Sequence, residues 1–291
     1  MAGFRNVRAV AASLEDDGRN WMGFIYKSSG PTGFGAGRWG DMSMGAGTPK
    51  YNAYVGSQAT ATALTGAGND GIYLGPVPSD GGSKRLHQAS LVSSVATLAP
   101  SSWILQDYLM FYPLIDGDST DQQDMINTTT LPRYADGEGV KMMIVCTTPA
   151  SADAAVTISY TNSDGVVGRT VTAFVSFTTV TGCIMSTGGN SSSTNARSPY
   201  LPLADGDRGF RSVEAVTLAG AVGGFFALVL VRPITTMVLP ENLVACETIE
   251  LMQKARLPEI EPGAFLNFIY CPGGAASNAF PLQGMLQTVW S

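Results

Sequence analysis

The residues that could carry acid–base chemistry are few and far apart in the sequence. His87 is the only histidine among 291 residues. A serine nucleophile would need that histidine as its base, together with a Gly-x-Ser-x-Gly elbow that the sequence lacks. Because no second catalytic residue lies near it in sequence, His87 indicates a surface or structural role. We therefore expect that the chain is not an enzyme.

One acidic loop has residue types that could bind a metal ion. Its sequence DGDSTDQQD contains Asp116, Asp118, Asp121 and Asp124. Several oxygen ligands from one loop suit a hard cation such as Ca²⁺, but this spacing departs from the EF-hand pattern. Two of these carboxylates could also serve glycoside hydrolysis. We expect a solvated turn and no cofactor, while calcium binding by the Asp116–Asp124 loop stays open.

The four cysteines do not form a recognisable metal or redox motif. Cys146, Cys183, Cys246 and Cys271 are far apart, without a Cys-x-x-Cys pair, and each lies in or beside an apolar segment. Zinc would need paired cysteines or histidines at closer spacing. Free cysteine behaves as a small hydrophobic residue, so we expect four buried, reduced thiols without a disulfide.

Composition limits the kinds of partner. The formal net charge is -6 and the pI is about 4.8, which opposes nucleic-acid binding because that rests on clustered Lys and Arg. Charged residues are only 14% of the chain, compared with about 25% in an average soluble domain. The longest apolar run, Ala219 to Val231, is too short to cross a bilayer, which takes ~20 residues. These features predict a folded protein whose surface is covered by protein partners.

Residues 1–85 differ in composition from the rest of the chain. Glycine recurs every few residues, with Phe34, Trp39, Tyr51 and Tyr54 scattered among them. A linker would lack such aromatic side chains, so we expect an extended, sparsely structured N-terminal arm whose four aromatic residues bind a partner surface. The alternative is a locally folded extension of the following domain. The start of the chain has no apolar core typical of a secretory signal, so synthesis in the cytoplasm is expected.

Residues 86–291 have the pattern of an antiparallel β-sandwich domain. Strands are predicted at 139–148, 154–161 and 168–177, with Asp164-Gly165 as the hairpin turn between the last two. The segment SWILQDYLMFYPLI fits a strand better than a short helix because of its aromatic residues, and it should end at Pro113. The spacing in Thr248 to Ala255 predicts one short helix.

The segment from Phe210 to Pro240 is the expected centre of this domain. Alternation from residue 213 to 218 is followed by an unbroken apolar run, Phe225 to Val231, which is typical of a strand covered on both faces. We expect the intervening glycines to form a hairpin and Pro233 to end the second strand. With no alternation of strands and helices, the pattern predicts an all-β fold, a jelly-roll or Greek-key sandwich.

Four segments resemble virion structural proteins of tailed bacteriophages, among their minor capsid and head-decoration components. They are TISYTNSDGVVGRTVT, LPLADGDRGFRSVEAV, ALVLVRPI and LPEIEPGAFLNFIY, within residues 157–270. The resemblance implies a β-rich subunit, often a symmetric homo-oligomer, that binds the outside of a capsid shell. Its partner would be the major capsid protein, and its location the virion, assembled in the host cytoplasm.

Two functions are therefore kept open. The first is a structural protein that decorates or cements a phage capsid, which agrees with the low charge and the lack of catalytic groups. The alternative is a tail- or fibre-associated protein that binds host-surface glycans. For that role, the Asp116–Asp124 loop beside Tyr108 and Tyr112 is the best candidate site.

Overall fold

The computed structural model describes residues 4, 6–16, 18–31, 33, 35–66, 71–78, 82–94, 98–176, 178–186, 198–249, 257–274 and 281–291. This part of the chain is almost entirely antiparallel β-structure, as the sequence predicts. Within it, helical structure is limited to α1 (Val7–Glu15) and the short 3-10 helix η1 (Met42–Met44). The side chain of Asn6 caps α1 by accepting a hydrogen bond from the Ala9 amide at 2.9 Å.

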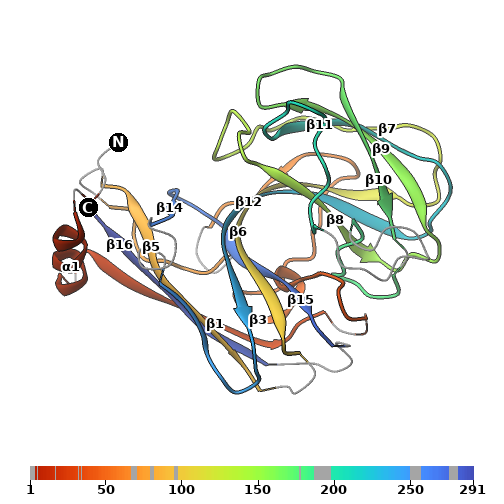
Figure 1. Ribbon diagram of the computed structural model, residues 1–291. Helices are drawn as coiled ribbons and strands as arrows, with labels where there is room; N and C mark the ends of the chain where they lie inside the picture. Colours follow the sequence, from red (N-terminus) through yellow and green to blue (C-terminus); the bar gives the residue numbers. More distant parts are fainter. Residues whose placement is uncertain are drawn as a thin grey trace.

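Three sheets build the fold, and we name them terminal, central and distal (Figure 1). The terminal sheet has the order β13 (Cys246–Ile249), β5 (Lys84–Ser93), β16 (Leu282–Trp290), β1 (Asn20–Ser29) and β3 (Ala46–Thr48), and β14 (Glu259–Ile260) also pairs with β5. The central sheet has the order β2 (Gly40–Asp41), β15 (Leu266–Pro272), β6 (Ser101–Asp116), β12 (Phe225–Leu239) and β8 (Lys141–Thr148), and β4 (Thr62–Ala63) pairs with β6. The distal sheet has the order β10 (Arg169–Val175), β9 (Ala154–Asn162), β11 (Phe210–Leu218) and β7 (Gln123–Asp124).

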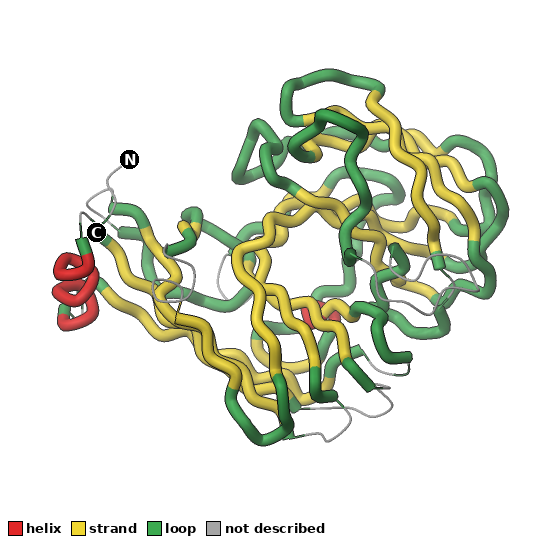
Figure 2. The backbone as a smooth tube through the Cα atoms, in the orientation of Figure 1, coloured by secondary structure: helices red, strands yellow, loops and turns green. Residues whose placement is uncertain are grey.

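The long strands β6 and β12 join two sandwiches. They pair antiparallel from Phe225 opposite Asp116 to Leu239 opposite Ser101. At one end of this pair the central sheet packs against the distal sheet, and at the other end against the terminal sheet (Figures 1 and 2). A single pair of strands therefore contributes to both cores, which couples the two sandwiches.

The prediction that β12 is a central strand covered on both faces is confirmed. It lies between β6 and β8. Successive side chains of the apolar run alternate between two cores: Phe226, Leu228 and Leu230 face the distal sheet, and Ala227, Val229 and Val231 pack in the core on the opposite face. All six are fully buried. The period of two in a strand puts one apolar set on each face, so only a run without polar residues fits here.

Two details predicted around β12 are wrong. β11 and β12 do not form a hairpin, because β11 pairs with β9 and β7 in the distal sheet. The glycines between them, with positive φ at Gly223 and Gly224, instead carry the chain from one sheet to the other. β12 also does not end at Pro233, since the pairing with β6 shifts register between Pro233 and Thr235. The missing amide of proline thus falls at a bulge, where the ladder is already interrupted.

The other strand predictions are mostly confirmed. β9 and β10 form the predicted hairpin, with Gly165 at φ 79° and the Asn162 side chain accepting from the amides of Asp164 and Val166. β6 is a strand, but it continues past Pro113. The predicted helix is wrong at its start, because Thr248 and Ile249 pair with β5; residues 250–255 lie outside the described part of the chain.

The N-terminal segment is not sparsely structured throughout. β1 lies inside the terminal sheet, where it pairs with β16 from Asn20 opposite Val289 to Lys27 opposite Leu282. Its inward-facing residues then share a core with β5 and β16. Within residues 35–66, Trp39, Met44 and Tyr54 pack on the face of the central sheet that is opposite the distal sheet. Ala59 and Ala61 instead pack in the core shared with the distal sheet. The terminal sheet is therefore built from both ends of the chain, and residue 85 lies within one of its strands.

Candidate functional site

The four aromatic residues predicted to bind a partner are not equivalent in the structure. Trp39 and Tyr54 are 8% and 1% exposed and pack in the core on the central sheet, so their predicted role as partner anchors needs correction. The physical reason is that the chain's own β6, β8 and β12 present an apolar face that these rings cover. Tyr51 is 48% exposed and stays available to a partner. Phe34 lies outside the described residues.

Tyr54 also belongs to a buried polar network around Asp41. The Asp41 carboxylate accepts hydrogen bonds from the hydroxyl groups of Tyr54 and Tyr108 and from the Ser43 amide, the last two at 2.6 and 2.9 Å. Burial raises the pKa of Asp41, and these hydrogen bonds partly offset that rise. Because Asp41 is fully buried, the network fixes the N-terminal segment to β6 and offers no open site to a substrate.

Lys27 is a second buried charge in the N-terminal segment. Its ammonium group donates to the carbonyl of Gly45 at 3.0 Å and to that of Pro49. Burial lowers the pKa of Lys27 to about 8, opposed by the negative charge of Asp41. The ammonium thus holds the turn that follows β3 against β1.

The acidic loop forms an ordinary turn, and its aromatic neighbours are buried. Asp116 accepts a hydrogen bond from the amide of Asp118 at 2.9 Å, as in an ordinary turn. No group of three or more His, Cys, Asp or Glu residues in the described part of the chain is placed to hold a metal ion. Tyr108 and Tyr112 are both fully buried. The predicted pairing of exposed aromatic and acidic residues is therefore wrong.

The single histidine and the cysteines have structural surroundings. His87 is half-buried at a register shift in β5, with Nδ1 3.3 Å from Oε1 of Gln287. No disulfide joins the four cysteines. Cys146 and Cys183 are buried as expected, whereas Cys246 and Cys271 are only partly buried.

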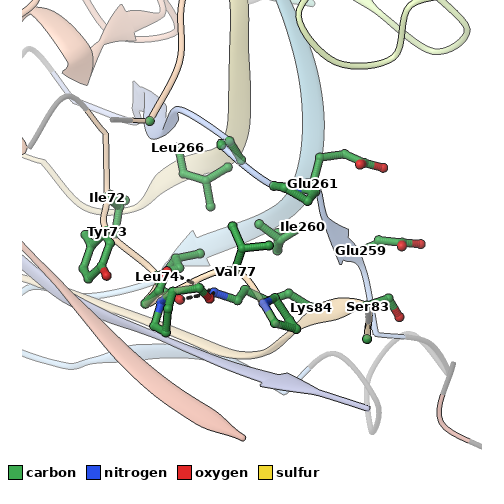
Figure 3. Close-up of a pocket in the computed structure, with 18 residues that line it drawn as sticks. Ile72, Tyr73, Leu74, Val77, Ser83, Lys84, Glu259, Ile260, Glu261 and Leu266 are labelled. Carbon is green, nitrogen blue, oxygen red and sulfur yellow. Dashed lines mark hydrogen bonds between the residues drawn. The ribbon is translucent and has the colours of Figure 1, made fainter. Parts of the chain in front are cut away.

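A cavity of about 440 Å³ lies between the terminal and central sheets (Figure 3). Apolar side chains such as Ile72, Val77 and Leu266 line it, beside Lys84 and the carboxylates at its rim. The Lys84 ammonium already donates to the carbonyls of residues 74, 75 and 76, at 2.6, 3.2 and 2.6 Å. At the rim, Glu259 pairs with Arg85 at 3.1 Å. Lys84 and Glu259 at this cavity therefore already have interaction partners within the chain.

The side of β1 that faces away from the core carries an exposed row of apolar residues. Met22, Phe24 and Tyr26 are 47%, 66% and 47% exposed, while the intervening Ile25 and Lys27 are buried. Strand alternation places the first three on one face of the sheet. Large apolar side chains that are adjacent and exposed are typical of an interaction site rather than of an ordinary surface.

The neighbouring strands β16 and β5 extend this row into a surface that we call the outer face. Its residues are Met22, Phe24 and Tyr26 of β1, Gln283, Met285 and Gln287 of β16, and Ser90 and Val92 of β5, aligned by the strand registers. None of these eight residues is Asp, Glu, Lys or Arg, and the nearest acidic residue by register is Glu247, opposite Ser90 on the edge strand β13. A hollow of about 390 Å³ lies on this face, beside Phe24 and between the three strands. Helix α1 covers only the end of the sheet, where Val10 packs on Val289.

Comparison with known proteins adds little to this description. No family model matches the chain, and no curated protein matches it. Among solved structures, it is similar to a mutant VP2 protein of infectious bursal disease virus from derived T=1 particles, with 10% sequence identity and a TM-score of 0.20. That alignment covers 93% of this chain and 77% of the other. A TM-score of 0.20 does not indicate a shared fold.

None of the helices in the described residues has the length and hydropathy needed to span a membrane.

The sequence did not reveal the outer face, because the composition of residues 1–85 predicted an extended arm. The signal was nevertheless present: in NWMGFIYK, aromatic and apolar residues occupy both alternating sets of positions. A half-buried strand with one solvated face would carry polar residues on one of these sets.

Proposed function

We propose that this chain is a structural subunit of a virus particle and acts through protein–protein contacts. The observation that carries the proposal is the uncharged outer face, where Phe24 alone is 66% exposed. Leaving such a surface in water is unfavourable, so a partner that covers it stabilises the assembly. The centres of specific interfaces are likewise depleted in charged residues and enriched in aromatic residues and methionine.

The rest of the chain supports a structural role. The buried charges, Lys27 and Asp41 among them, are engaged in hydrogen bonds that fix segments together. The resemblance of residues 157–270 to virion proteins of tailed bacteriophages gives the proposal its particle type. In this proposal the subunit decorates or cements the outer surface of the capsid, with the major capsid protein as its partner.

Localisation on purified particles tests this proposal. Antibodies raised against the exposed hairpin of β9 and β10, which contains Val166 and Val167, would be used for labelling in negative-stain images. We expect regular labelling over the head, and loss of the label when the particles are stripped of this chain. Purified particles that lack the chain, or that carry it only on tail fibres, would contradict the proposal.

A further inference from the structure

We infer that the outer face of the terminal sheet binds a second copy of this chain across a two-fold axis. This inference rests on the proposed structural role and specifies one of its partners. In such a dimer the same surface of each copy forms the interface, so this surface must be complementary to itself.

The first argument is the shape of the outer face. The ring of Phe24 stands 66% exposed beside the hollow of about 390 Å³. This hollow is bounded by Ser90 and Val92 on β5 and by Gln283 and Met285 on β16. A projection and a hollow next to each other on one surface are complementary under two-fold rotation, since each copy inserts its ring into the other. A buried aromatic side chain in a pocket is the usual energetic centre of an interface.

The second argument is electrostatic. Residues 114–218, which include the whole distal sheet, contain eleven acidic and six basic residues, so they account for -5 of the net charge of -6. Two copies that approach through their distal sheets would repel each other. The eight residues of the outer face carry no formal charge, and the terminal sheet lies at the opposite end of the molecule (Figures 1 and 2). Contact through this face keeps the acidic ends apart, which favours this orientation over others.

The third argument is the partial cover that α1 already provides. The helix packs Val10 against Val289 at one end of the face, and Leu257 completes that small core. The apolar row on β1 continues the same surface without cover. Asn20 pairs with Val289, and Met22, Phe24 and Tyr26 follow along β1. A second copy would thus extend an existing layer and bury the row that one chain leaves in water.

The test measures association of the purified full chain and three variants by sedimentation equilibrium, at concentrations up to about 100 µM. Wild-type protein should reach twice the 30.4 kDa mass of one chain. Phe24→Asp places a charge in the partner's hollow and should weaken association by about 30-fold or more. Ser90→Trp fills the hollow without adding charge and should weaken it as well. Phe174→Asp, at a 44% exposed phenylalanine of the distal sheet, is the matched control and should associate like wild type.

Circular dichroism melting of each variant checks that it is folded, and Ser90→Trp keeps the test decisive if Phe24→Asp does not fold. Wild-type protein that stays monomeric overturns the inference, and so does a dimer that survives both outer-face variants or dissociates in Phe174→Asp. A monomer that still binds stripped particles through Phe24 would show that the outer face binds the shell instead. That result would overturn self-association and leave the proposed function intact. Absence of the chain from particles would overturn the proposed function instead.

Discussion

The guanidinium group of Arg133 and the carboxylate of Asp107 form a buried ion pair with two hydrogen bonds. Nε of Arg133 donates to Oδ2, and Nη2 donates to Oδ1, both at 2.8 Å. Arg133 also donates to the carbonyl oxygens of Leu64 and Tyr108, at 3.0 and 2.9 Å. Asp107 accepts from the amide of Phe265 at 2.9 Å. One ion pair therefore connects the N-terminal segment, β6 and the loop before β15.

Removal of one member of this pair should destabilise the fold. We expect Arg133→Met to lower the free energy of unfolding by about 3–5 kcal/mol, because it leaves the Asp107 carboxylate buried without its partner. Arg208→Met is the control: that arginine pairs with Glu138 and Asp164 on the surface, where the ion pairs are solvated, so little change is expected. Urea unfolding followed by fluorescence measures both. Equal stability of the two variants would show that the Arg133 pair is not buried in solution.

A charge in β12 should be equally disruptive. Leu228 is fully buried between the central and distal sheets, so Leu228→Asp should destabilise the protein by several kcal/mol. Val167→Asp, at a 68% exposed position in the β9–β10 hairpin, should cost no more than about 0.5 kcal/mol. Thermal melting distinguishes the two. A wild-type melting temperature for Leu228→Asp would mean that the strand is exposed.

The buried lysines predict a rise of stability at mildly alkaline pH. Burial lowers the pKa of Lys27 and of Lys84 to about 8, whereas the usual value is 10.5. Between pH 8 and pH 10.5 these two lysines therefore bind more protons in the unfolded chain than in the folded chain, so their contribution to the free energy of unfolding rises with pH. Burial also raises the pKa of Cys146, Cys183 and Cys271 above the usual thiol value, and that of Tyr54 and Tyr108 above 10. The trend therefore reverses once the thiols, and then the tyrosines, ionise in the unfolded chain.

Urea titrations from pH 7 to pH 11 would show this dependence as a maximum near pH 9. Lys27→Met is the comparison variant, because it removes one of the two amines and should flatten the rise. A steady fall in stability above pH 8, in wild type and variant alike, is the result that would contradict the buried state of these lysines.

The thiol groups should react slowly while the protein is folded. Burial raises the pKa of Cys146 to about 12 and that of Cys271 to about 11, so the reactive thiolate is scarce at neutral pH. We expect four alkylated cysteines in urea without reductant, and slower labelling of the buried Cys146 and Cys183 than of Cys246 and Cys271 in the native protein. Mass spectrometry of the peptides measures this order. Recovery of a peptide pair linked by a disulfide would refute it.

Deletion of residues 1–66 should prevent folding. It removes β1, which pairs with β16 over eight positions, and it removes Trp39 and Tyr54 from the core on the central sheet. The face of β6, β8 and β12 would then be open to water, together with half of the terminal sheet. Circular dichroism and a melting curve test the truncated chain. A cooperative transition near that of the full chain would show that the segment is a dispensable arm after all.

Local patterns in the sequence determined the strands of this protein. The unbroken apolar run from Phe225 to Val231 predicted a strand covered on both faces, and Asp164-Gly165 predicted a hairpin, because both signals act between neighbouring residues. These features follow from side-chain periodicity and turn chemistry, which need no knowledge of distant segments.

Only the tertiary structure decided which strands meet. β1 and β16 pair although Lys27 and Leu282 lie at opposite ends of the chain, and local patterns do not encode such a register. This pairing leaves Phe24 exposed on the outer face, whereas Tyr54 is buried against the central sheet. Both are aromatic residues of the N-terminal segment, so their types do not distinguish a core position from a surface position. What separates them is which face of which sheet lies opposite, and this depends on contacts between residues far apart in sequence.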